Sequence, residues 1–199
     1  MADKRARDQL ARAASAFRQP HLPSLVLMTD DTRLPDPIAA ARQLPRGSMI
    51  IVRSRDDSRL VELARELKPI ARARSLLLLA ALSTKAIDID GIHLSETRAH
   101  EAAHWRARHP NWIITAAAHS LSAAAQARYA DAILLSPVFQ TRSHSGAATL
   151  GPIKARVIAR LIDKPVYALG GIDAHTVKHL RDATLAGIAA IGALDPAAP

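Results

Sequence analysis

The sequence predicts a compact α/β fold, a (β/α)8 TIM barrel whose last helix is vestigial or missing. Short apolar runs of strand length alternate with longer amphipathic stretches along the chain, and this alternation is typical of a parallel sheet. The runs are almost continuously apolar, as expected of parallel strands that are covered on both faces. There are eight of them, which favours a closed barrel over an open doubly wound sheet of about five or six strands.

Each expected strand is a run of four to six apolar or small residues. The expected strands are Leu25–Thr29, Met49–Val52, Leu76–Ala80, Gly91–Leu94, Trp112–Ala117, Ala132–Ser136, Val166–Gly170 and Gly187–Gly192. The stretches between them place apolar side chains at helical spacing, and the helices expected there are Asp36–Leu44, Asp56–Leu67, Thr97–Arg108, Leu121–Tyr129, Pro152–Ile162 and Ala174–Ala183. Pro152 suits the first position of a helix, and Asp173 can cap a helix that begins at Ala174.

The two ends of the chain complete the expected organisation. The 199 residues are near the lower limit for this fold, and seven residues follow Gly192, which is too few for a full last helix. Residues 1–21 form a basic N-terminal segment, in which the periodicity of Lys4–Phe17 predicts a helix covering the floor of the barrel. Residues 22–199 are expected to form one TIM-barrel domain.

Composition excludes several kinds of site. The chain has no cysteine, which excludes thiol nucleophiles, iron–sulfur clusters and cysteine-ligated zinc. Aromatic residues make up 3% of the sequence, so stacking platforms for single-stranded nucleic acid are nearly absent. The net charge is 27 − 18 = +9, but the basic residues are scattered along the helices. We therefore expect a solvated basic surface and no nucleic-acid partner.

The apolar runs are too short for a membrane protein. The longest, Leu76–Leu82, has seven residues, whereas a spanning helix needs about 20. The start Met1-Ala-Asp-Lys-Arg lacks the apolar core of a signal peptide. We expect a soluble cytoplasmic protein with no membrane partner.

Glycines at the ends of the last two strands suggest a phosphate site. In TIM barrels a phosphate often binds to the loops after strands seven and eight. Strand seven ends with Gly170 and Gly171, and Gly192 follows strand eight. Glycine lets backbone N–H groups approach an anion closely, and a helix beginning at Ala174 would add its positive end. A tight turn is the alternative explanation of the Gly-Gly pair.

Three other strand ends carry polar groups. His119 closes strand five, and histidine is suited to proton transfer near neutral pH, although it could also bond the start of the next helix. Arg53 and Arg55 follow strand two and could recognise a phosphate or carboxylate, or simply lie on a basic surface. The hydroxyl-rich loop 136–146 could cover an anionic ligand or stay solvated.

One motif suggests different chemistry. His100, Glu101 and His104 match the H-E-x-x-H zinc pattern, and His109 is nearby. However, this segment belongs to the helix after strand four, on the outer ring of the barrel. Catalytic zinc needs a third ligand and a cleft, so a solvated helix face is the favoured interpretation over a zinc hydrolase.

Several stretches, in order and at matching separations, resemble the thiamine-phosphate synthase/TenI superfamily, which are (β/α)8 barrels of thiamine biosynthesis. They are Leu25–Asp30, Ile50–Asp56, Asp90–Leu94, Ala117–Ser120, Tyr129–Thr141, Pro165–Ile172 and Ala186–Gly192. The resemblance extends from about residue 22 to 194 and is most specific between 117 and 172. It allows a homodimer, since barrels of this family often pair.

The resemblance implies a binding site for a thiazole phosphate. The residues at the family's phosphate positions are Gly170, Gly171, Ile191 and Gly192. Thr141 and Ser143 correspond to hydroxyls of the loop after strand six, and His144 stands where synthases typically have lysine. Arg53 matches a family arginine, and Arg55 replaces a lysine.

The family's diphosphate and magnesium positions are changed. Synthases hold a pyrimidine methyl diphosphate through Mg²⁺, with ligands from an Asn-Asp after strand three and an aspartate after strand four. Here Ala80-Ala81-Leu82 and Arg98 occupy these places, and Ile51 replaces a glutamine. Mg²⁺ requires oxygen ligands, so we expect no metal and no other cofactor.

The phosphate positions are thus kept while the diphosphate and magnesium positions are changed. In this the chain resembles the TenI branch, the metal-independent thiazole tautomerases, whose catalytic histidine lies in a Ser-x-His-Ser segment. Ala117-Ala118-His119-Ser120 keeps that histidine, so the resemblance implies proton transfer by His119. One alternative is a divergent thiamine-phosphate synthase with magnesium on Glu96, Asp88 or Asp90. Another is a catalytically inactive barrel that binds a phosphorylated metabolite.

Overall fold

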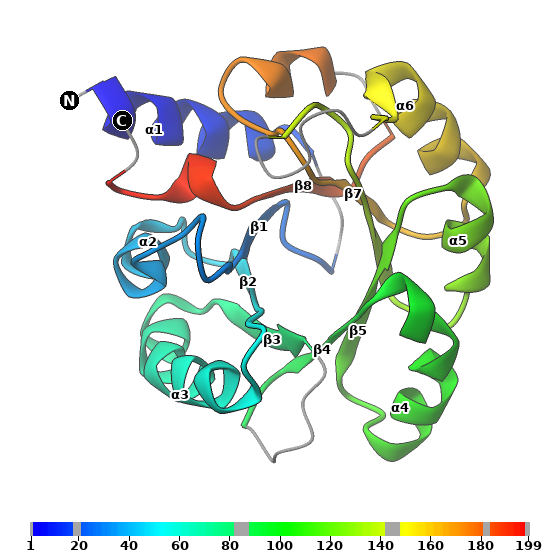
Figure 1. The fold of residues 1–199 in the computed structure, drawn as a ribbon, viewed down its shortest axis with the longest axis horizontal. Helices are drawn as coiled ribbons and strands as arrows, with labels where there is room; N and C mark the ends of the chain where they lie inside the picture. The colour runs from blue at the N-terminus through cyan, green and yellow to red at the C-terminus, as the bar shows by residue number, and fades with distance from the viewer. Residues whose placement is uncertain (1, 18–20, 82–87, 142–147, 181–183, 198–199) are drawn as a thin grey trace.

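The predicted TIM barrel is confirmed. The computed structural model describes residues 2–17, 21–81, 88–141, 148–180 and 184–197. Its eight strands are all parallel and follow one another in chain order, and β8 pairs with β1 to close the barrel. Figure 1 shows the helices arranged outside the ring of strands.

The strands agree with the predicted ones, each to within two residues at either end. They are β1 Leu25–Met28, β2 Met49–Val52, β3 Leu77–Ala81, β4 Gly91–Leu94, β5 Ile113–Ala118, β6 Ala132–Leu135, β7 Val166–Ala168 and β8 Gly187–Ala190. Alternate side chains fill the interior and the layer beneath the helices, because successive residues of a strand point to opposite faces. The largest buried interior side chains include Met49, Ile51, Leu79 and Tyr167.

Tyr167 closes one end of the barrel interior. Its side chain is fully buried, and its hydroxyl donates to the carbonyl oxygen of Pro23 at 2.5 Å. Pro23 lies just before β1, at the amino ends of the strands. Burial raises the pKa of the Tyr167 phenol above its usual range. His119, Arg53 and Arg55 lie at the opposite end, just after the carboxyl ends of β5 and β2.

The helices also follow the predicted pattern, but two predicted segments differ in type: the first half of Thr97–Arg108 and the described part of Ala174–Ala183 are 3₁₀ helices. They are α1 Ala2–Ala14, α2 Pro37–Gln43, α3 Asp57–Arg74, α4 Ala102–Arg108, α5 Leu121–Gln126 and α6 Gly151–Leu161. Short 3₁₀ helices are η1 Glu96–Glu101, η3 Thr176–Leu180 and η4 Gly192–Leu194. Asp36 and Asp56 cap α2 and α3, each accepting from a backbone N–H at 2.8 Å. None of the described helices is long and apolar enough to cross a membrane.

The N-terminal helix α1 lies elsewhere than on the floor of the barrel. It packs in the outer layer, where Leu10 and Ala14 are buried in the same apolar cluster as the barrel helices. It contacts η3 and η4, and Arg7 bonds to carbonyl oxygens of Asp195 and Pro196. Only a 3₁₀ turn follows β8 in the described chain, so the amphipathic helix covers that side of the barrel instead (Figure 1).

Candidate active site at the carboxyl ends of the strands

The two glycines after β7 are required by the backbone. Gly170 and Gly171 have φ of +92° and +65°, a region that favours glycine. A Cβ on Gly170 would lie 2.8 Å from Cα of Pro137, and one on Gly171 would lie 2.4 Å from the carbonyl oxygen of Gln140. The loop after β6 therefore packs directly on the loop after β7. This packing alone explains the Gly-Gly pair, as the tight-turn alternative anticipated.

The segment after β7 is more weakly helical than expected. A helix from Ala174 was predicted, but the described part is the 3₁₀ helix η3 from Thr176. Asp173 accepts from the backbone N–H groups of His175 and Thr176, each at 2.8 Å, which confirms its capping position. The Thr176 hydroxyl donates to the Gly171 carbonyl at 2.7 Å. Because η3 has five residues, it adds less dipole than a full helix would.

The end of β8 lies beside the loop after β1. Ile191 is half-buried and precedes η4, which starts at Gly192. A Cβ on Gly192 would be 3.2 Å from the carbonyl oxygen of Arg33. Among the described residues, the N–H groups of Gly171 and Gly192 donate to no other group. Both amides are thus available in the described structure, and their phosphate role stays a prediction.

The predicted residues of the loop after β6 are described in part. Thr141 is half-buried, at the end of the segment that packs on Gly171. Ser143 and His144 lie outside the described residues. The structure therefore leaves their expected contact with a phosphate untested.

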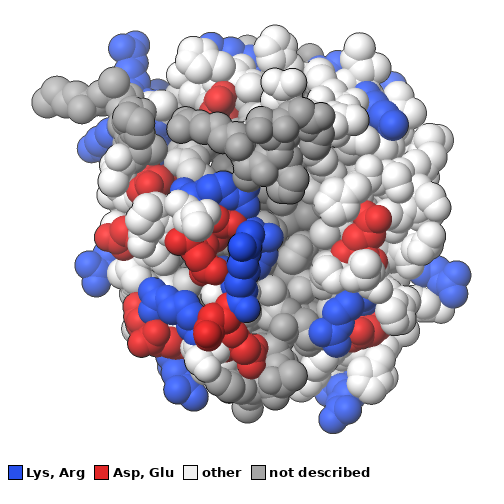
Figure 2. All heavy atoms as spheres, in the orientation of Figure 1, with Lys and Arg blue, Asp and Glu red and all other residues white. Residues whose placement is uncertain are grey.

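A charged cluster covers the ends of β1 and β2. Asp30 follows β1 and accepts from the guanidinium groups of Arg33, at 2.6 Å, and of Arg53. The bond from Arg33 is the largest cause holding the pKa of Asp30 well below its usual range. Two cations around one carboxylate leave this cluster positive. Figure 2 shows charged side chains gathered more densely on the α2–α3 side of this face than on the α5–α6 side.

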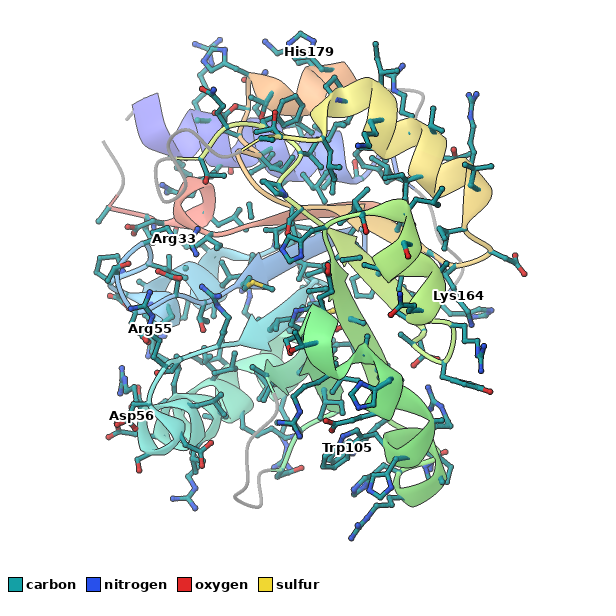
Figure 3. The ribbon with its side chains drawn as sticks, turned by 45° about the vertical axis from the view of Figure 1, so that its right-hand side comes forward. Arg33, Arg55, Asp56, Trp105, Lys164 and His179 are labelled. Atoms are coloured by element: carbon teal, nitrogen blue, oxygen red, sulfur yellow. The ribbon has the colours of Figure 1, made fainter. Side chains whose placement is uncertain are left out.

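The arginines after β2 differ in their surroundings. The backbone of Arg53 is fixed by Thr29, whose hydroxyl accepts from its N–H at 2.7 Å and donates to its carbonyl at 2.9 Å. Arg55 is exposed, and its N–H donates to Asp31 at 3.0 Å. Figure 3 places Arg33 and Arg55 on the same side of the barrel, over the loops after β1 and β2. Sequence reasoning identified Arg53 and Arg55 but missed Arg33 and Asp30.

His119 directly follows β5 and is paired with Glu96, which lies just after the neighbouring strand β4. Its side chain is 56% exposed, and its Nδ1 lies 2.6 Å from Oε2 of Glu96. The backbone N–H of His119 donates to the same oxygen at 2.6 Å. The next residue, Ser120, caps α5 by accepting from the N–H of Ala123 at 3.1 Å. The imidazole is thus held at the mouth of the barrel with solvent access.

A second histidine, which sequence reasoning missed, lies deeper. His93 is buried on β4, and its Nδ1 is 2.9 Å from the hydroxyl of Thr115 on β5. Burial lowers the pKa of His93 to about 4, and the positive charge of Arg53 adds to the effect. His93 is therefore neutral at pH 7. The alternation of side chains along the strands could have indicated this position. His93 pairs with Ala81, which lies two residues beyond the inward-facing Leu79 and therefore on the same face of the sheet.

The three carboxylates expected as magnesium ligands in the synthase alternative do not lie together at the mouth. Asp88 pairs with Lys68 at 3.1 Å and with Arg72 at 3.0 Å, and Asp90 accepts from the backbone N–H of Leu78 at 2.8 Å. Both aspartates precede β4 and so lie at the opposite end of the barrel. Glu96 is bonded to His119, as described above. No group of three or more metal-ligating side chains is found in the part of the chain that the structure describes.

The zinc-like motif is divided between two kinds of helix. His100 and Glu101 belong to the 3₁₀ helix η1, whereas His104 belongs to α4. Glu101 accepts two bonds from Arg98, at 2.6 and 2.9 Å, and one from Trp105 at 3.3 Å. The motif therefore lacks the continuous α-helix that places its two imidazoles together.

Comparison with known proteins identifies the family. The model of the family described as thiamine monophosphate synthase matches residues 25–194. A putative thiamine-phosphate synthase 2 of Aquifex aeolicus is 33% identical over 167 residues, which is 79% of this chain and 89% of that protein. A thiamine-phosphate synthase of Chlorobium luteolum is 31% identical over 189 residues, 91% of this chain and 89% of that protein.

A solved structure agrees at the level of the fold. Thiamine phosphate pyrophosphorylase from Pyrococcus furiosus superposes with a TM-score of 0.66 at 23% identity, covering 93% of this chain and 87% of that one. The family match and the two relatives confirm the resemblance stated from the sequence. The chain belongs to the thiamine-phosphate synthase/TenI superfamily.

Proposed function

We propose that the protein is a metal-independent, thiazole tautomerase-like enzyme that moves a proton on a thiazole phosphate carboxylate. The amides after β7 and β8, with Thr141, Ser143 and His144, would bind the phosphate. His119 would take a proton from the ring and return it to a carbon outside the ring, so that the ring becomes aromatic. Arg53 and Arg55 would bind the substrate carboxylate or screen its phosphate. Positioned proton transfer of this kind contributes about 10²- to 10⁴-fold to a rate.

The observation that carries this proposal is the pairing of acidic side chains near the mouth. In the described chain, Asp30 is held by two arginines and Glu96 by His119. Arg98, where synthases have an aspartate, is bonded to Glu101. A diphosphate–magnesium complex needs several free oxygen ligands, whereas proton transfer needs one imidazole that solvent and substrate can reach.

The second candidate is a thiamine-phosphate synthase, joining the thiazole phosphate to the pyrimidine methyl diphosphate with release of pyrophosphate. The names of the relatives support it, since the proteins of Aquifex aeolicus and Chlorobium luteolum both carry it. The carboxylates described above would then have to leave their present partners to bind magnesium. A non-catalytic barrel that binds a phosphorylated metabolite is the third.

Two assays on one preparation separate these functions. Aromatisation of thiazole phosphate carboxylate is followed in EDTA, and coupling of the two phosphorylated substrates is followed with and without Mg²⁺. The proposal expects aromatisation that EDTA does not slow, and no coupling above background. Magnesium-dependent coupling without aromatisation would overturn it in favour of the synthase, and ligand binding without either turnover would favour the third candidate.

A further inference from the structure

Glu96 and His119 meet because β4 and β5 are neighbours in the barrel. The two residues are 23 positions apart in the chain, and each follows or ends one of these paired strands (Figure 1). A single carboxylate oxygen, Oε2 of Glu96, accepts from the backbone N–H of His119 and also contacts its Nδ1, both at 2.6 Å. The backbone bond fixes the carboxylate, and the ring contact then fixes the imidazole.

This arrangement selects one tautomer of His119. An ionised carboxylate only accepts hydrogen bonds, so Nδ1 of the neutral ring must carry its proton and Nε2 keeps its lone pair. A ring with a free lone pair on Nε2 is ready to accept a proton from a substrate. We infer that Glu96 is a positioning residue, which holds His119 in the tautomer and orientation required for proton transfer; this inference rests on the function proposed above.

The neighbouring charges leave Glu96 available for this role. Arg98, two residues further along η1, would be the natural competing partner for its carboxylate. It is held instead by two bonds to Glu101, at 2.6 and 2.9 Å. Glu101 is thus the counter-ion of Arg98, and Glu96 serves His119. Glu96 would have to leave His119 in order to bind Mg²⁺.

A purely structural role for Glu96 makes a different prediction. If Glu96 only tied η1 to β5, the backbone bond would be sufficient, and the state of the imidazole would not depend on the carboxylate. The two roles therefore differ in the tautomer of the ring, which can be observed without any substrate. They also differ in kinetics, because a positioning residue acts on kcat more than on KM.

The experiment uses the full chain with Glu96→Ala, Glu96→Gln and the control Glu62→Gln. Glutamine keeps an acceptor oxygen but loses the charge. The control removes an exposed carboxylate from α3, where Glu62 pairs with Arg59, and leaves Arg98 and His119 with their partners. Long-range ¹⁵N–¹H spectra at pH 8 report the tautomer of His119, assigned by comparison with His119→Gln. Tautomerase kinetics and thermal melting are measured on the same samples.

We expect the unaltered protein to show the Nδ1–H tautomer and Glu96→Ala to shift toward the Nε2–H tautomer that free histidine prefers. We expect kcat to fall roughly 100-fold in Glu96→Ala and roughly 10-fold in Glu96→Gln, with KM within about 2-fold, and the control to match the unaltered protein. An unchanged tautomer in a folded Glu96→Ala protein would overturn the inference. A Glu96-dependent tautomer in a protein without tautomerase activity would support the positioning and overturn the proposed function.

Discussion

The mouth of the barrel has two regions that are built by different means. On the glycine side, at the ends of β7 and β8, the backbone itself forms the surface, and Gly170 and Gly171 are fixed by packing against the loop after β6. On the side-chain side, at the ends of β1, β2, β4 and β5, partly exposed charged groups bond to one another across neighbouring strands. Substitutions on the glycine side should therefore cost stability first, whereas those on the side-chain side should cost activity first.

The largest effect is expected for His119→Gln. The side chain is 56% exposed, so its loss should change the free energy of unfolding by less than about 0.5 kcal/mol. Tautomerase kcat should fall by about 10³-fold, the contribution of one positioned acid/base group. Steady-state kinetics and a urea titration measure the two effects. Full activity in this variant would remove His119 from the mechanism.

Gly171→Ala should have its main effect on the free energy of unfolding. A Cβ would lie 2.4 Å from the Gln140 carbonyl oxygen at a φ of +65°, so either the loop after β6 or that after β7 must move. We expect a loss of about 3 kcal/mol in the free energy of unfolding.

Gly47→Ala is the matched control. Gly47 has a φ of +74° and nothing within 4 Å of the new Cβ, so it should lose only about 1 kcal/mol. Urea denaturation compares the two variants. Equal losses would mean that backbone conformation, and not packing of the two loops, fixes the glycine side.

His93 tests the interior beneath the side-chain side. Because burial lowers its pKa from 6.5 to about 4, the unfolded chain binds a proton there at a pH where the folded chain does not. Stability from the neutral ring is complete above pH 6.5 and is lost as the pH falls toward 4, by about 3 kcal/mol. Unfolding free energies of the unaltered protein and His93→Gln should therefore converge by that amount over this range. His104→Gln, at an exposed position, is the control. If the unfolding free energies of the unaltered protein and His93→Gln differed by the same amount at every pH from 6.5 to 4, a neutral buried His93 would be contradicted.

A modest effect is expected for Asp30→Asn. The pKa of Asp30 is lowered in the folded state, so its stabilisation is present above the unfolded value of 3.8 and lost below it. Loss of its charge-assisted bonds to Arg33 and Arg53 should cost about 1 to 2 kcal/mol at pH 7, and the difference from the unaltered protein should narrow below about pH 4. A pH series of urea titrations checks this. No difference at pH 7 would show that solvent fully screens the cluster.

The strands and helices could be predicted because their apolar residues follow a pattern within each short segment of the chain. The buried strands are continuous apolar runs, and the helices have apolar residues at helical spacing. α1 was predicted as a helix but placed on the floor, since periodicity reveals an apolar face but not the surface it covers. The segment after β7 was predicted as an α-helix from its apolar spacing, whereas the described part is the 3₁₀ helix η3.

The site was less predictable because its partners are distant in sequence. Asp30 and Arg53, like Glu96 and His119, are 23 positions apart and meet only when neighbouring strands end together. The sequence suggested Glu96 only as an alternative magnesium ligand. Its partner in the structure, His119, belongs to the next βα unit. The strand ends nevertheless carried a usable signal, since every one of these polar residues follows or ends an apolar run.

A crystal structure with thiazole phosphate carboxylate bound is the most direct test of a phosphate-binding mouth that performs proton transfer without metal. The account predicts the phosphate against the amides of Gly171 and Gly192, with Nε2 of His119 within hydrogen-bond distance of the ring position that exchanges its proton. A phosphate bound elsewhere would contradict it. So would a Mg²⁺–diphosphate complex with Glu96 as a ligand of the Mg²⁺, in crystals grown with the synthase substrates.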